Sequence, residues 1–343
     1  MDKKIVDNAT HIIIRAIAIM ALLWLLYVVR DIVALFFLSV ILTATLDPAI
    51  DWMQKRKISR PVGVILIYLA LLLLVVIFAS IIIPPFISQF QSFTQNLPSY
   101  SETFTQLFAG IEKYANSYGI AFNSHEFLQN MFGSIFQSSG QLFSTTVSVF
   151  SFFIAMLAIL ALTFYMSVKE DSMNRFLVSI TPHEYHGHIV SLSDRIKSKI
   201  GKWLAGQLML MLIIFVLDFV ALSIFHIPYA LILALLAGLL EIVPYLGPII
   251  SATLAAMVGF LISPVTGLIV LAILTAIQQA ESHIIVPQVM KKAVGLNPVV
   301  VILALLVGAQ LGGTLGAILA VPVATAVGVL AGDIINNKKE NSH

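Results

Sequence analysis

The chain has 343 residues, of which 59% are hydrophobic and only 10% are charged; its mean hydropathy is +0.99. Soluble domains carry about 25% charged residues, so this composition predicts a protein embedded in lipid. A net charge of +2 and the lack of a basic, aromatic patch disfavour nucleic-acid binding. The absence of cysteine excludes disulfides, thiolate nucleophiles and zinc–cysteine sites.

Five apolar runs are long enough to cross a bilayer, which takes about 20 residues of helix. We expect full spans at residues 11–29, 61–83, 147–168, 204–225 and 265–286. The first run has basic residues before it but no clear A-x-A cleavage site, so we interpret it as an uncleaved span rather than a signal peptide. A shorter run at 32–46 is long enough only for a marginal span.

The distribution of lysine and arginine predicts the orientation, because these residues concentrate in cytoplasmic loops. Basic residues cluster near the amino terminus, at 54–60, in 169–202, at 291–292 and in the tail at 338–339. By contrast, the stretch 84–146 holds a single basic residue, Lys113. We therefore expect both termini and the segment 169–203 in the cytoplasm, and 84–146 on the outer side.

The outer segment 84–146 carries an amphipathic signal. Phe86, Phe90, Phe93 and Leu97 recur at intervals of three to four residues, which is typical of a helix with one apolar face. We expect this face to pack against other helices or the membrane surface. The alternative is a cap that contacts a substrate.

The cytoplasmic segment contains the sequence TPHE at Thr181–Glu184, which resembles a capping box with proline at the first helical position. We expect a helix to begin there and to run to about residue 203. His183, His186 and His188 are close in sequence but do not share one helical face, so we predict no metal site.

The stretch LLEIVPYLGPIIS, Leu239 to Ser251, places a glutamate, two prolines and a glycine within apolar sequence. The flanking runs, 229–243 and 249–262, are each too short for a full span. We interpret them as two half-helices that meet inside the membrane, in a hairpin that opens outward. Backbone groups freed by Pro244 and Pro248 must then face protein or water rather than lipid.

A second interrupted segment is LVGAQLGGTLGAILAVPVA, Leu306 to Ala324, which contains Gly308, Gly312, Gly313 and Gly316. Both its ends are expected in the cytoplasm, so this hairpin would open inward. Each hairpin follows one full span, which gives a repeat of opposite orientation, typical of secondary transporters. The alternatives are kinked full spans, or glycines that serve only helix packing.

The predicted fold is therefore all-α: a polytopic helical membrane protein with about 6–8 membrane segments, including two helix–break–helix hairpins in an inverted repeat. We divide the chain into membrane spans at 1–83, an outer helical segment at 84–146, a span at 147–168 and a cytoplasmic helical segment at 169–203. A transport core with both hairpins follows at 204–335, and a tail at 336–343.

Few ionisable residues lie in the predicted membrane region: Asp218 in the outer half of 204–225, Glu241 beside the first break, and Glu281 in the span 265–286. No Lys or Arg occurs between Lys202 and Lys291, so a buried carboxylate here must be protonated, hydrogen-bonded or matched by a bound cation. This chemistry suits coupling to H⁺ or Na⁺. The alternative is that Glu241 and Glu281 reach the headgroup zone or cap helix ends.

Neutral polar groups at the same depth are candidates for binding a solute. Gln278 and Gln279 lie beside Glu281, and Gln310 lies beside the second break at Gly312 and Gly313. Half-helix ends add unpaired amides or carbonyls that hold a small polar solute or a cation without extra charge.

Several stretches resemble the autoinducer-2 exporter (AI-2E) family of bacterial membrane proteins. They are GQLMLMLIIF, IPYALILALLAGLLEIVPYLGPIISA, QQAESHIIVPQVM and GLNPVVVILALLVGAQLGGTLGAILAVPVA, with LDPAIDWMQKRKISRPVGVILIYL near the amino terminus. Carried onto this sequence, the family signature falls on Glu241, Pro244, Tyr245, Gly247, Pro248, Gln279, Glu281, Pro287, Asn297 and Pro298. One departure is Ser282-His283, where a glycine or asparagine is expected.

The resemblance implies a multi-pass protein of the bacterial inner (cytoplasmic) membrane that transports either autoinducer-2, in quorum sensing, or sodium or lithium in exchange for protons. It also implies a homo-oligomer, and a pentamer is in keeping with the family. The expected partners are therefore the lipid bilayer, a small-molecule or cation substrate and further copies of the chain, with no nucleic acid.

Taken together, the sequence favours a secondary transporter of a small hydrophilic solute that works by alternating access, with 204–335 moving against the earlier spans. The nearest alternative is a Na⁺(Li⁺)/H⁺ antiporter. A passive channel needs polar or charged rings along a pore, and the sequence offers too few polar residues for them. We find no nucleotide loop, metal motif or nucleophile motif, so we predict neither an enzyme nor a resident cofactor.

Overall fold

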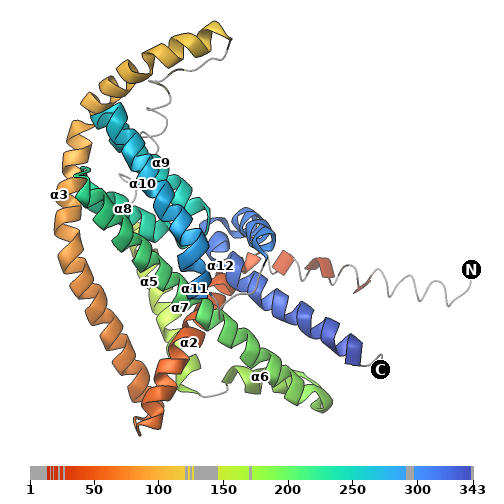
Figure 1. The fold of residues 1–343 in the computed structure, drawn as a ribbon. Helices are drawn as coiled ribbons and strands as arrows, with labels where there is room; N and C mark the ends of the chain where they lie inside the picture. The colour runs from red at the N-terminus through yellow and green to blue at the C-terminus, as the bar shows by residue number, and fades with distance from the viewer. Residues whose placement is uncertain are drawn as a thin grey trace, which may run out of the picture. The chain divides into compact units, whose positions relative to one another are not determined.

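The computed structural model describes residues 28–119, 146–169, 172–290 and 297–340, together with isolated positions between 14 and 25 and at 123 and 126. Over these residues the chain is helical, without β-strands, which confirms the all-α prediction (Figure 1). Most of the predicted first span 11–29, the part of the outer segment beyond 119, and Lys291 and Lys292 lie outside the described residues.

Ten α-helices and two short helices of other types make up the described part of the chain. They are α2 (Arg30–Lys55), α3 (Arg60–Ser117), α5 (Thr146–Val168), α6 (Ser172–Ile180), η1 (His183–Tyr185), α7 (His186–Ile224), α8 (Ala230–Leu240), α9 (Leu246–Ile262), α10 (Pro264–Ala280), η2 (Glu281–Ile285), α11 (Val286–Met290) and α12 (Pro298–Glu340).

Five stretches of the described chain are long and apolar enough to cross a membrane. They are Arg30–Lys55, Arg60–Phe93, His183–Ile224, Pro264–Met290 and Pro298–Ile335. Helices α5 and α6, which meet at an angle of 79°, would make a sixth if the pair forms one span, and α8 and α9 are shorter apolar helices. The structure is thus that of a polytopic helical membrane protein, in agreement with the sequence prediction.

Helix α2 is longer than the marginal span expected at 32–46. It extends to Lys55 and contains Pro48. The carboxylates that follow the apolar run, Asp47 and Asp51, both pair with Arg60 at the start of α3, at 3.4 and 3.3 Å. This neutralisation lets the helix continue past the apolar run and fixes the turn into α3.

Helix α3 runs without interruption across the predicted boundary between residues 83 and 84. Its 58 residues correspond to about 87 Å at 1.5 Å per residue, far more than the hydrocarbon core of about 30 Å. The rings of Phe86 and Phe90 stack with centroids 6.0 Å apart, as the helical spacing predicted. The span and the first half of the outer segment are therefore one helix.

The predicted capping box at Thr181 is wrong. The Thr181 hydroxyl donates to the Leu177 carbonyl at 2.7 Å and so closes α6 instead of opening the next helix. The chain then forms the short helix η1, preceded by Pro182 and without a side-chain cap. Helix α7 begins at His186 and continues to Ile224, so the cytoplasmic segment and the next span also form one helix.

The chain divides into two compact units. One comprises residues 1–44, 155–198 and 296–343, and the other comprises 45–154 and 199–295. The predicted transport core 204–335 therefore contributes residues to both units, and its boundaries stay a prediction. In the first unit, His188 and Arg195 near the start of α7 both pair with Asp333 of α12, the former at 2.7 Å.

Helix α12 is interrupted at Gly312 and Gly313, whose backbones are not helical; φ of Gly313 is 57°. A Cβ added to Gly308 would lie 2.4 Å from the Gly316 carbonyl oxygen. In a straight helix, residues eight apart are separated by about 12 Å along the axis. The two arms therefore fold back on each other, as a helix–break–helix hairpin does. Its predicted inverted relation to the first hairpin stays a prediction, because the two hairpins belong to different units.

Candidate functional site

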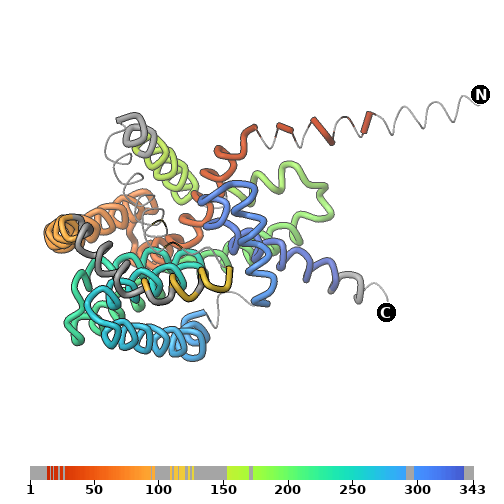
Figure 2. The backbone as a smooth tube through the Cα atoms, turned by 90° about the horizontal axis from the view of Figure 1, so that it is seen from above, coloured from red at the N-terminus to blue at the C-terminus, as the bar shows by residue number. Residues whose placement is uncertain are grey.

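The first predicted hairpin is formed by α8 and α9 in the second unit. Helix α8 has 11 residues and α9 has 17, and the break between them covers residues 241–245. The predicted half-helices, 229–243 and 249–262, match these bounds within a few residues. Helix α9 in turn lies alongside α10 (Figures 1 and 2), and Ser263 joins them by accepting a hydrogen bond from Thr266 N at 3.0 Å.

Small residues allow this hairpin to pack closely. A Cβ on Gly238 would lie 2.8 Å from the Met211 carbonyl oxygen, so only glycine lets α8 lie so close to α7. A Cβ on Gly247 would lie 2.3 Å from the Leu240 carbonyl oxygen, so the first turn of α9 presses directly on the last turn of α8. Gly247 is therefore needed for the break itself.

The break also requires unusual backbone geometry and an outside hydrogen-bond donor. Tyr245, which precedes α9, has φ of 68°, a conformation that costs roughly 1–3 kcal/mol for a non-glycine residue. At the end of α8, the Gln207 side chain of α7 donates to the Glu241 carbonyl. Gln207 is 1% exposed, so it supplies a buried partner for a carbonyl that the helix end leaves free.

The open end of the hairpin, at the start of α8, is held by α3. The Ile232 amide near the start of α8 donates to the Gln89 side chain at 3.4 Å. Asn96 donates to the Tyr229 hydroxyl, also at 3.4 Å, and the rings of Phe93 and Tyr229 meet edge to face. Helix α3 thus contributes to the position of α8, and with it to that of the break.

Three carboxyl groups gather beside the break, one from each of three elements. Asp218 lies on α7, Glu241 follows α8, and Glu281 lies where α10 passes into η2; all three are buried, with exposed fractions of 6%, 3% and 5%. The side chains of Glu241 and Glu281 interact directly, and Asp218 is close enough to interact electrostatically with Glu281. Their burial inside this unit disfavours the alternative in which Glu241 and Glu281 reach the headgroup zone.

These carboxyl groups lack basic partners among the described residues, where no ion pair involves Asp218, Glu241 or Glu281. Two of their oxygens, Asp218 Oδ1 and Glu241 Oε2, are buried without a hydrogen-bond partner. Like charges this close cannot all be present in a buried site without a proton or a cation between them. The arrangement is therefore suited to taking up and releasing a positive charge.

Helix η2 is a turn of π-helix, and Glu281 is its first residue. A π-helical turn inserts one extra residue and frequently marks a functional site. Here it lies directly at the carboxyl cluster.

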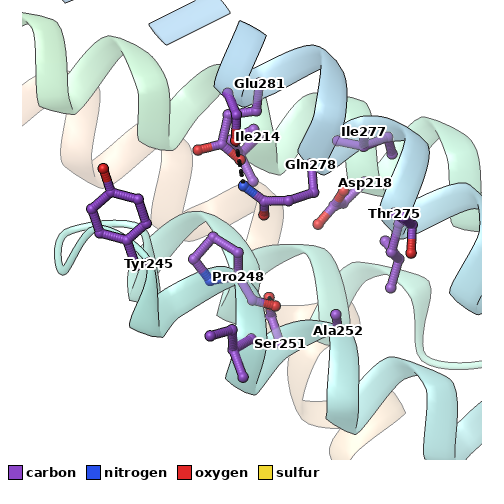
Figure 3. Close-up of a pocket in the computed structure, with 13 residues that line it drawn as sticks. Ile214, Asp218, Tyr245, Pro248, Ser251, Ala252, Thr275, Ile277, Gln278 and Glu281 are labelled. Carbon is purple, nitrogen blue, oxygen red and sulfur yellow. Dashed lines mark hydrogen bonds between the residues drawn. The ribbon is translucent and has the colours of Figure 1, made fainter. Parts of the chain in front are cut away.

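A cavity of about 360 Å³ adjoins the cluster, between α7, α9 and α10 (Figure 3). Its polar lining consists of Asp218, Tyr245, Ser251, Thr275, Gln278, Glu281 and Ser282. The remaining lining is apolar and comes from Ile214, Pro248, Ile249, Ala252, Leu274 and Ile277. The space is large enough for a small molecule and has a predominantly apolar wall with a few polar groups, as ligand pockets usually have.

The structure brings together most of the predicted site residues of the second unit. Asp218, Tyr245, Pro248, Gln278 and Glu281 line the cavity, while Glu241, Pro244 and Gly247 form the break next to it. Gln279 is exposed and does not line the cavity.

The remaining predicted residues belong to the first unit. Asn297 accepts a hydrogen bond from the Val299 amide at 2.9 Å and thereby caps α12. Gln310, Gly312 and Gly313 are exposed at the break of α12. Whether they share a site with the cavity residues stays a prediction.

Sequence reasoning missed Gln207, Ser251 and Thr275. A signal for Gln207 was present: residues 207, 211, 214 and 218 recur at three to four residues and so share one face of α7. This face carries Gln207 and Asp218, the two polar residues that reach the hairpin. We find no sequence signal for the π-helical turn at Glu281.

With this geometry in place, the chain can be compared with known proteins. Residues 13–335 match the family described as AI-2E family transporter. The chain belongs to the AI-2E transporter family. The match covers both hairpins, all three carboxyl groups and the cavity.

Several proteins similar in sequence to this chain are named as candidate transport proteins. YrrI of Bacillus subtilis (strain 168) is 26% identical over 318 residues, which cover 89% of this chain and 86% of YrrI. YueF of the same strain is 30% identical, with 82% and 78% covered. YhhT of Escherichia coli (strain K12) is 22% identical, with 91% and 88% covered. Their names fit a transport protein rather than an enzyme.

Proposed function

We propose that this chain is a secondary active transporter that moves a small hydrophilic solute across the bacterial cell membrane by alternating access, driven by an ion gradient. The observation that carries the proposal is the buried cluster of Asp218, Glu241 and Glu281 at the break between α8 and α9, next to a cavity of about 360 Å³. Ionisable groups are costly inside a membrane and commonly lie on ion or substrate pathways.

The directly interacting pair Glu241 and Glu281 would carry the coupling ion. With no basic partner in the same unit of the described chain, the pair must release or accept a proton, or exchange it for a sodium ion, whenever access changes. Because Glu281 also lines the cavity, its charge state would affect solute binding directly. This link gives coupling without any nucleotide.

The break supplies a way to change access. Gly247, Tyr245 and the Gln207 hydrogen bond hold the two half-helices by a small number of close contacts. A few such contacts can rearrange while the helices stay intact, as broken helices do in transporters. We propose that the hairpin is the element that opens and closes the cavity.

Autoinducer-2 is the solute suggested by the family resemblance, and we include it among the solutes to be tested. We further propose that both termini are cytoplasmic and that the chain forms a homo-oligomer such as a pentamer. The α3 span supports contact with lipid or with further copies, because only 6% of its most apolar 18-residue stretch is buried.

A transport assay in proteoliposomes tests the proposal. Wild-type protein should move labelled autoinducer-2 or another small solute at a rate that depends on an imposed proton or sodium gradient. In Glu281→Gln and Glu241→Gln, which keep the side-chain shape but cannot ionise, we expect gradient-driven uptake to fall at least tenfold. Glu184→Gln is the matched control, because Glu184 is an exposed residue of η1.

The second candidate function is Na⁺(Li⁺)/H⁺ exchange, which is favoured by the direct interaction of two carboxyl groups. A pH dye inside the same vesicles distinguishes the two. Proton movement in response to sodium or lithium pulses without any solute, lost in both variants, would favour the antiporter. Normal solute and proton movement in both variants would show that the two glutamates are structural and would overturn the proposed coupling.

A further inference from the structure

Asp218 lines the cavity between α7, α9 and α10 and carries a buried carboxyl oxygen without a partner among the described residues. Its side chain is only 6% exposed, and Oδ1 has no hydrogen-bond partner among the described residues. Figure 3 shows Asp218 directed into the space bounded by Gln278 of α10 and Ala252 of α9. A buried carboxylate oxygen without a partner is costly, so this position is suited to a ligand that supplies a positive charge.

The ionisable groups that line the cavity are all acidic. Its ionisable lining consists of Asp218, Glu281 and the tyrosine Tyr245, with no lysine, arginine or histidine. The sequence from 203 to 290 contains no lysine or arginine that could enter the cavity from a neighbouring turn. An anionic solute would therefore be repelled by these groups when they are ionised, and no positively charged side chain would offset the repulsion.

The apolar part of the lining favours an organic ion over a bare inorganic one. Sodium-like ions need several oxygen ligands around one point. Ser251, Thr275 and Gln278 add oxygens, but nearly half of the lining residues are apolar and offer no ligand: Ile214, Pro248, Ile249, Ala252, Leu274 and Ile277. A volume of about 360 Å³ is also far larger than a single ion requires. Apolar side chains of this kind accommodate hydrocarbon groups.

We propose that this cavity binds a small organic monocation with an apolar body, such as a quaternary or protonated amine, with Asp218 as its counter-charge. The inference rests on the proposed function and narrows its solute class from a small hydrophilic molecule to an organic cation. Tyr245, another residue of the lining, adds an aromatic ring, a group to which ammonium ions bind favourably.

Binding at Asp218 also predicts exchange for a proton. In the proposed exchange, a proton neutralises the Asp218 carboxylate while the site is empty and leaves to solvent when the cation binds, so one positive charge replaces another. The proton and the solute then bind the same carboxylate at different times, so Asp218 cannot carry both at once.

Binding of labelled benzyltrimethylammonium to the purified full-length protein in detergent tests this inference. Unlabelled benzyl alcohol and benzoate share the aromatic body but carry no charge and a negative charge, respectively. We expect saturable binding that unlabelled benzyltrimethylammonium displaces and the other two do not. About one proton should be released into weakly buffered solution for each cation bound. At pH values where the free carboxyl group is protonated, each further drop of one pH unit should weaken cation binding about tenfold.

Asp218→Asn should weaken binding at least tenfold and abolish proton release. Asp31→Asn is the matched control, since Asp31 is an exposed residue at the start of α2. Asp218→Glu should restore binding in part, and the melting temperature of each variant separates a lost site from a lost fold. Equal displacement by benzyl alcohol, or unchanged binding in a folded Asp218→Asn protein, would overturn the inference.

The two proposals fail in different ways. If the cation binds through Asp218 but no gradient drives its movement in vesicles, the solute class stands and the proposed coupled transport is wrong. If gradient-driven transport of an uncharged solute depends on Glu281 while benzyltrimethylammonium does not bind, coupled transport stands and the organic-cation inference is wrong. If sodium alone competes at millimolar concentration, with the same dependence on Asp218, the site binds an inorganic cation and the organic-cation inference is wrong.

Discussion

At the scale of single residues, Gly247 shows how strongly the break depends on close backbone contact. A Cβ added to Gly247 would lie 2.3 Å from the Leu240 carbonyl oxygen. The lack of a side chain therefore lets the start of α9 lie directly against the end of α8. Leu240 is the last residue of α8, so the atom that would have to give way belongs to the backbone rather than to a flexible side chain. Glu241, the next residue, holds its side chain in the carboxyl cluster.

We predict that Gly247→Ala destabilises the protein by about 2–4 kcal/mol and displaces Glu241, because the added methyl group must push the two half-helices apart. Thermal unfolding in detergent, followed by the proteoliposome assay, measures both effects. Gly187→Ala is the control, since a Cβ there meets no atom within 4 Å. If the Gly247→Ala protein keeps its melting temperature and transport, the two half-helices can move apart at little cost in free energy, which would contradict the prediction.

At the scale of elements, much of the site could be predicted from the sequence because prolines and glycines interrupt apolar runs. Pro244, Gly247 and Pro248 located the first break, and the half-helix lengths followed from what remained on each side. The absence of lysine and arginine from 203 to 290 likewise indicated that a buried Glu241 or Glu281 would have no basic partner nearby in the sequence. The structure places these two side chains close enough to interact.

Other elements could not be predicted because their causes are contacts between segments far apart in sequence. The length of α3 was missed because only the apolar run at 61–83 indicated a span, yet the helix continues beyond it and carries Gln89 to α8. The capping box at Thr181 failed because the hydroxyl closes α6 instead. The partnership of Gln207 with the Glu241 carbonyl joins residues 34 apart and has no local signature beyond the polar face of α7.

The arms of α12 provide the prediction at this scale. A Cβ on Gly316 would lie 2.0 Å from the Gly308 carbonyl oxygen, so the arms cross where neither has a side chain. We expect Gly316→Ala to force them apart and to lower the melting temperature, at a cost of about 2–4 kcal/mol. Gly332→Ala, further along α12 with open space around its Cα, should be neutral or slightly stabilising. Equal melting temperatures for the two variants would contradict a tightly crossed hairpin.

At the scale of the whole molecule, the distribution of basic residues and the length of α3 together predict which parts of the chain lie on each side of the membrane. Lys55 ends α2 within the basic cluster 54–60, and Ser117 ends α3 in a segment that is poor in basic residues. A helix of 58 residues exceeds the thickness of the bilayer with its headgroups, about 40–45 Å, so its two ends can lie in opposite aqueous phases.

Because the natural chain has no cysteine, single substitutions can report this arrangement without background labelling. We expect Ser117→Cys to react with a membrane-impermeant maleimide added to intact bacterial cells, since Ser117 is exposed and on the predicted outer side. Lys55→Cys and Glu184→Cys, at exposed positions in the predicted cytoplasmic regions, should react only after the membrane is permeabilised. Labelling of Lys55→Cys in intact cells, with Ser117→Cys protected, would show that the orientation is opposite to the predicted one. The hairpin of α8 and α9 would then open to the cytoplasm, and the transport direction in the vesicle assay would have to be reassigned.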